Sequence, residues 1–134
     1  MKHIILVVLV SLILAGCLPS IQREKGPDAT GEFIKGQVVR GFPGLPLYPK
    51  SQVIETYGSI EGYGGSFVSK DKLSKVVNFY GPTLGQLGWE TVLRKKSESY
   101  YVYEIKNDNF IGEVIINIAS DNKQTAITVA LEPR

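Results

Sequence analysis

The one cysteine of this chain stands in a setting that favours modification of its thiol. Cys17 follows two small residues, Ala15 and Gly16, which allow an extended backbone to enter a protease site. A sulfur atom is also the nucleophile that can accept a lipid group. Because no second cysteine exists, a disulfide within the chain is excluded.

An apolar segment leads up to this cysteine. Two basic residues, Lys2 and His3, precede the run Ile4–Ala15, which only one serine interrupts. A basic start followed by about a dozen apolar residues is the layout of a secretory signal peptide. A transmembrane helix needs ~20 apolar residues, and here Pro19 follows the run closely. We therefore expect a cleaved signal rather than a stable membrane span.

The tetrapeptide Leu14-Ala15-Gly16-Cys17 resembles the lipobox of bacterial lipoproteins, in which an aliphatic and two small residues precede the cysteine. The resemblance implies that residues 1–16 are removed by cleavage between Gly16 and Cys17. It also implies a diacylglyceryl group on the Cys17 thiol. A second acyl chain such as palmitate matters physically, because one chain anchors a protein only marginally whereas two anchor it stably. The alternative is a short apolar helix that contains a cysteine by chance.

This resemblance implies a location and a first partner. The partner is the membrane, reached through the lipid on Cys17, and the location is the extracytoplasmic side of the bacterial cell envelope. Since residue 18 is Leu and not Asp, the outer membrane is allowed in a bacterium with two membranes. We expect residues 17–45, rich in Pro and Gly, to form the lipidated start and a tether. Residues 46–134 would then form a small domain.

Three tyrosines on one expected strand are the best candidates for a binding surface. In an extended strand Tyr101 and Tyr103 share one face, whereas Tyr100 points to the other. Aromatic rings with polar tips can stack on a sugar ring or on a peptide. The competing explanation, which we favour, is that Tyr suits strands and that its ring covers the core.

Catalytic equipment is sparse in this chain. The only histidine lies in the expected signal peptide, so neither a histidine base nor a Cys/His metal cluster is expected after cleavage. A small hydrolase using two carboxylates stays open as an alternative. The carboxylates available for it belong to Glu55, Glu61, Asp71, Glu90 and Glu104. None stands in a recognisable signature, and we expect no enzyme.

Two further patterns have simple structural explanations. The glycines at 58, 62, 64 and 65 lack the Gly-Lys-Ser/Thr of a phosphate-binding loop, so we expect a flexible hairpin turn and no cofactor. The basic run Arg94-Lys95-Lys96 is most simply a solvated strand end. With 15 basic and 13 acidic residues, the chain also lacks the basic bias of a nucleic-acid-binding protein.

The elements that position these residues follow from hydrophobic periodicity. Residues 52–57 and 66–69 predict a hairpin, and an apolar stripe from Leu73 to Leu87 predicts one amphipathic helix. Ser69 or Asp71 would cap that helix, Gly88 would end it, and Pro82 would kink or split it. Whether residues 32–40 add an edge strand stays open.

Four further strands, at 89–95, 99–106, 110–120 and 124–132, are separated by short polar turns. The predicted fold class is therefore α+β: an antiparallel sheet in ββ-α-ββββ order, a meander after the helix, and the helix packed on one face. Three parts of the chain are distinctive: Leu47-Tyr48-Pro49, then Phe79-Tyr80 with Leu84, then Leu87-Gly88-Trp89. Together they resemble small uncharacterised extracytoplasmic domains of bacterial lipoproteins. Pro82 departs from the straight helix expected there.

These observations favour a membrane-tethered lipoprotein that acts as a non-catalytic binding or accessory module of the cell envelope. Its partner would be an envelope protein or a glycan, meeting the open sheet face or an exposed strand edge. The small hydrolase and a purely structural lipoprotein are the alternatives.

Replacing the thiol tests the lipid anchor. In the Cys17→Ala variant we expect the precursor to stay uncleaved, because lipid transfer to sulfur precedes cleavage in the lipoprotein pathway that the lipobox implies. Mass spectrometry of the mature N-terminus should find acyl chains only on the wild-type chain. Equal membrane partitioning of both forms, with no lipid mass on either, would contradict the lipobox assignment.

Overall fold

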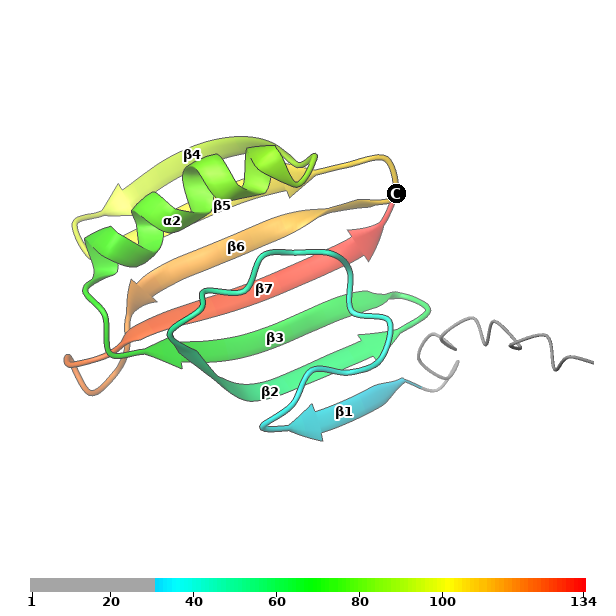
Figure 1. Cartoon of the computed structure of the whole chain (residues 1–134), viewed down its shortest axis with the longest axis horizontal. Helices are drawn as coiled ribbons and strands as arrows, with labels where there is room; N and C mark the ends of the chain where they lie inside the picture. Colours follow the sequence, from blue (N-terminus) through cyan, green and yellow to red (C-terminus); the bar gives the residue numbers. More distant parts are fainter. Residues whose placement is uncertain (1–30) are drawn as a thin grey trace, which may run out of the picture.

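A computed structural model describes residues 31–134 of the chain. The expected signal peptide, Cys17 and the stretch 18–30 lie outside these described residues. One helix and one antiparallel sheet make up the described part, and the strands lie in the spatial order β1-β2-β3-β7-β6-β5-β4 (Figure 1). The elements are β1 (Glu32–Lys35), β2 (Ser51–Ser59), β3 (Gly62–Ser69), α2 (Leu73–Gln86), β4 (Glu90–Ser97), β5 (Tyr100–Lys106), β6 (Phe110–Ile118) and β7 (Thr125–Pro133).

The predicted α+β class and element order are confirmed. Strands β4 to β7 pair with their chain neighbours in an antiparallel meander, as expected. Strand β7 also pairs with β3, with Phe67 opposite Ile127, which joins the meander to the β2–β3 hairpin in one sheet. The helix crosses one face of this sheet (Figure 1).

The question of an edge strand before residue 46 is answered by β1. Phe33 of β1 lies opposite Tyr57 of β2, so residues 32–35 form an edge of the sheet. Val39 and Leu45, which follow β1, are both buried. The folded unit therefore includes residues from position 32 onward, and a boundary at residue 46 is too late.

The glycine-rich hairpin differs from the expected loose turn. The predicted turn glycines Gly58, Gly62 and Gly64 lie within β2 and β3, and only Ile60 and Glu61 separate the two strands. At Gly64 an added Cβ would lie 2.2 Å from the ring of Tyr57, the residue directly opposite on β2. Glycine is needed there because an aromatic ring covers the backbone of the neighbouring strand.

The helix begins and ends through backbone geometry. Its N-cap is Lys72, without a side-chain cap, so the predicted capping by Ser69 or Asp71 is wrong. The Ser69 hydroxyl instead donates to the Lys50 carbonyl at 2.9 Å and accepts from the Asp71 amide. Gly88 ends the helix as predicted, with a φ of 85°. The helix runs through Pro82 without being split.

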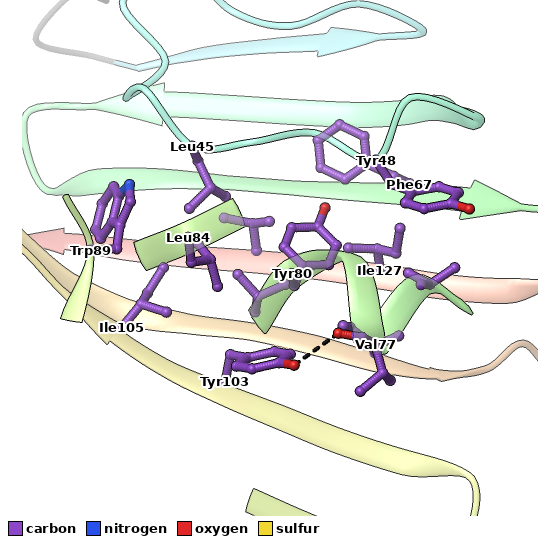
Figure 2. Packing of buried hydrophobic residues seen from close by; sticks show 14 of the residues in the cluster. Leu45, Tyr48, Phe67, Val77, Tyr80, Leu84, Trp89, Tyr103, Ile105 and Ile127 are labelled. Atoms are coloured by element: carbon purple, nitrogen blue, oxygen red, sulfur yellow. Dashed lines mark hydrogen bonds between the residues drawn. The ribbon is translucent and has the colours of Figure 1, made fainter. Parts of the chain in front are cut away.

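The helix covers one half of the sheet with its apolar stripe. Val76, Val77, Tyr80 and Leu84 are buried on that side, and Figure 2 shows Leu84 and Tyr80 directed toward the sheet. Ile127 of β7 lies within the same buried cluster. Burying such side chains supplies most of a small domain's stability, at about 1.5–3 kcal/mol for each fully buried aliphatic or Phe side chain.

The loop between β1 and β2 covers the other half. Leu45 and Tyr48 are buried in the same cluster as the helix stripe, although prolines flank both (Figure 2). Two side-chain hydrogen bonds hold the loop: the Trp89 indole donates to the Gly44 carbonyl at 3.1 Å, and the Tyr48 hydroxyl donates to the Asp71 carboxylate. Residues 36–50 therefore cover the hydrophobic core and belong to the folded domain rather than to a spacer.

Two leucines at the end of the helix differ in how deeply they are buried. Leu84 is fully buried, whereas Leu87, just beyond the helix, is 55% exposed. We expect Leu84→Ala to lower the free energy of unfolding by about 2–5 kcal/mol, since it leaves a cavity. Leu87→Ala should change it by no more than about 0.5 kcal/mol. Urea denaturation of both variants measures this, and equal losses would contradict the packing described.

Candidate binding surface on the open face of the sheet

The second face of the sheet is covered by no described segment. The helix and the loop 36–50 lie on the same side (Figure 1), and strand side chains alternate between the two faces. Next to the core pair Phe67 and Ile127, the opposed residues Ser66 and Thr128 point to the open face. Five large side chains are exposed on this face: Phe33, Tyr57, Val92, Tyr100 and Ile111.

The three candidate tyrosines do not share a surface. Tyr103 is only 4% exposed and donates its hydroxyl proton to the Val77 carbonyl of the helix at 2.8 Å (Figure 2). Burial raises the pKa of Tyr103. Tyr101 packs partly against the core, with the Lys95 ammonium 5.9 Å from its ring centre. Of the three, only Tyr100 is exposed on the open face.

A shallow groove lies on the open face over β4, β5 and the start of β6. It has a volume of about 470 Å³, and its apolar lining includes Val92 and Ile111. Gly112 also lines it, and a Cβ there would lie 2.0 Å from the Ala130 carbonyl oxygen. Glycine is needed there because the backbone of the neighbouring strand β7 leaves no room for a side chain.

Ion pairs border this groove. Glu90 pairs with Lys106 at 3.0 Å, and Glu104 pairs with Arg94. Hydrogen bonding to Arg94 is the main reason why the pKa of Glu104 lies below its usual value, and the same contact raises the pKa of Arg94. Both pairs are exposed, so they contribute little stability. The two ion pairs place charged side chains around the apolar residues Val92 and Ile111 of the groove.

Three of the five candidate carboxylates already have charged or hydrogen-bonding partners. Of those proposed for a hydrolase, Glu90 and Glu104 both line the groove. A general acid needs a raised pKa, whereas the Arg94 contact lowers that of Glu104. Asp71, whose pKa is also lowered, accepts a hydrogen bond from Tyr48 and pairs with Lys75 at 3.4 Å. Among residues 31–134, no group of three or more His, Cys, Asp or Glu side chains is placed to hold a metal ion.

Strand β4 borders the groove and forms one edge of the sheet. It pairs with β5 on one side, and no described strand pairs with its other side. Nearly all of its side chains are exposed, including the basic run Arg94-Lys95-Lys96. A bulge between Lys95 and Ser97 interrupts the pairing near the end of the strand. Upstream of the bulge, β4 offers free backbone donors and acceptors.

Sequence reasoning did not find the groove. Val92 belongs to a strand in which apolar and charged residues do not alternate cleanly, and Ile111 lies among the apolar residues of β6. Only the register, which places Ile111 opposite Lys106 and Val92 opposite Glu104, brings them to one surface. The exposed aromatic pair Phe33 and Tyr57 likewise depends on the pairing of β1 with β2.

Comparisons with known protein families, with curated proteins and with solved structures find no match for this chain. Within residues 31–134, the helix present is neither long nor apolar enough to span a bilayer.

Two buried tyrosines provide a test of the structural role of Tyr103. Its hydroxyl donates to the Val77 carbonyl, whereas the buried Tyr80 hydroxyl finds no partner in good hydrogen-bond geometry among residues 31–134 and lies near the backbone of Tyr48. We expect Tyr103→Phe to destabilise the fold by about 1 kcal/mol, and Tyr80→Phe to be neutral or stabilising. Thermal unfolding of the two variants distinguishes them. A larger loss of stability in Tyr80→Phe than in Tyr103→Phe would contradict these hydroxyl contacts.

Proposed function

We propose that this protein is a lipid-anchored, extracytoplasmic binding module that holds an envelope protein against the open face of its sheet. Cys17 would supply the anchor and residues 18–30 the spacer, since a Pro/Gly-rich chain of 13 residues has a root-mean-square span of ~20 Å when it is flexible. The observation that carries the proposal is the groove between Val92 and Ile111, an apolar floor with ion pairs at its border. An apolar centre with a polar rim is the usual anatomy of a protein interface.

The partner that fits this groove is an extended peptide segment. Because β4 has free backbone groups along its outer edge, such a segment can extend the sheet by one strand. Alternate side chains of an added strand would reach the open face, where an apolar side chain can contact Val92. Arg94 and Lys96 on β4 favour an acidic residue in the same segment.

The absence of a catalytic role is part of the proposal. Glu104, the groove carboxylate with a shifted pKa, is held ionised beside Arg94, which suits a recognition contact better than proton transfer. The groove is also shallow and lies on an open sheet, whereas small-molecule sites are usually concave and bury most of their ligand.

Site-specific crosslinking in intact cells tests this function. A photoreactive amino acid is placed at Val92 or at Ile111, and at Ile54 as a control. Ile54 is 42% exposed but lies on β2, on the far side of the sheet from the groove. We expect the two groove positions to give the same protein adduct and Ile54 to give none.

Binding by the identified partner is then measured with purified proteins. Val92→Asp should weaken it by roughly tenfold or more, since a charge would replace an apolar contact at the centre of the interface. Ile54→Asp is the matched control and should leave affinity unchanged. Identical adducts from all three positions, or an affinity indifferent to Val92→Asp, would contradict the proposal.

A further inference from the structure

Lysines distant in sequence converge at one end of the sheet. Lys50 precedes β2 and Lys70 follows β3, and the register places these strand ends side by side, with Ser51 opposite Ser69. Lys72 is the N-cap of the helix, and Lys123 lies in the turn before β7, whose first residue is opposite Ser69. The start of the helix and these strand ends lie together at the left of Figure 1.

The carboxylates at this end are already occupied. Asp71 accepts a hydrogen bond from Tyr48 and pairs with Lys75, and Glu98 pairs with Lys95 at 2.6 Å. Asp121 accepts hydrogen bonds from the backbone amides of the turn that follows it, which lowers its pKa. By contrast, Lys50, Lys70, Lys72 and Lys123 make no ion pair within 4.0 Å in the described part of the chain.

Two adjoining cavities bring these lysines together. One, of about 340 Å³, is lined by Lys50 and Lys70. The other, of about 500 Å³, is lined by Lys70, Lys72 and Lys123. The linings also contain neutral hydrogen-bonding side chains, among them Ser51, Gln52, Ser74, Asn122 and Gln124. Two carboxylates line them as well: Asp71, which lines both cavities and pairs with Lys75, and Glu98, which lines the second and pairs with Lys95. Four ammonium groups without an ion pair in the described part of the chain outnumber these two carboxylates, both of which are already paired, so the surface is suited to several phosphate groups at once.

The opposite end of the sheet has a different character. Glu61 lies in the β2–β3 turn, Asp108 in the β5–β6 turn and Glu132 near the end of β7. Gly31, where the described chain begins, is at this acidic end, since a Cβ on it would lie 3.4 Å from that of Ser59. The lysine end and the start of the domain are thus separated by the length of a nine-residue strand, or roughly 30 Å.

We propose that the lysine end, defined by Lys50, Lys70, Lys72 and Lys123, binds a soluble phosphate-bearing polymer outside the bilayer. The near-neutral composition conceals this site because the fold gathers, within residues 31–134, four lysines without ion pairs at one end of the sheet. The preference for a soluble polymer over lipid headgroups depends on the anchor proposed above, which attaches the chain at the acidic end. The phosphate chemistry itself depends only on the lysines.

Binding of sodium polyphosphate to the full chain in a non-ionic detergent tests the site. The variant Lys70→Gln/Lys123→Gln is compared with Lys106→Gln/Arg134→Gln, which removes equal charge at the acidic end. We expect the first variant to bind roughly thirtyfold more weakly and the second to match wild type. The dependence of affinity on salt should fall by about one unit of slope for each lysine removed.

Three results would overturn the proposal. The first is equal loss in both variants, which would show attraction to net charge only. The second is polyphosphate binding that neither variant changes. The third is that the lysines matter for binding to vesicles with anionic phospholipid but not to polyphosphate, which would assign the site to lipid headgroups. Because none of these readouts needs lipidated Cys17 or an occupied groove, failure here leaves the proposed function standing, and the reverse also holds.

Discussion

One helix cannot cover both faces of a seven-stranded sheet, and this constraint organises the described molecule. Helix α2 has 14 residues, or about 21 Å of length, and its stripe from Val76 to Leu84 covers only the half of one face beside the meander. The rest of that face is covered by the loop 36–50, through Leu45 and Tyr48. Nothing within residues 31–134 remains for the second face, so its side chains meet the surroundings directly.

The two attachments of the loop explain how a proline-rich segment can serve as a cover. Trp89 at the end of the helix holds Gly44, and Asp71 before the helix holds Tyr48, so both ends of α2 are tied to the same loop. Burial and the contact with Asp71 raise the pKa of Tyr48 to about 12. The protonated Tyr48 hydroxyl therefore stabilises the fold fully below pH ~10, the ordinary Tyr pKa. This stabilisation is lost as the pH rises toward 12.

Local pattern predicted most of the fold but little of its surfaces. Alternation in β6 and β7 and helical spacing from Leu73 to Leu87 identify these elements, because each buries one face. In the sequence the glycines of β2 and β3 resemble a turn, because only strand pairing shows that a tyrosine ring covers Gly64. Burial of Leu45 among prolines, the groove at Val92 and the lysine end all arise from tertiary register. The hydrophobic periodicity of the sequence does not predict these three features.

The central claim is that the open face is covered by a partner in the envelope, and thiol labelling in place tests it most directly. Single variants Val92→Cys and Ile111→Cys place a thiol in the groove of that face, and Asp108→Cys places one in an exposed turn. We expect a membrane-impermeant maleimide to modify all three in the purified chain. In intact envelopes it should modify only Asp108→Cys. Equal modification of the three in both settings would show that the open face has no partner there.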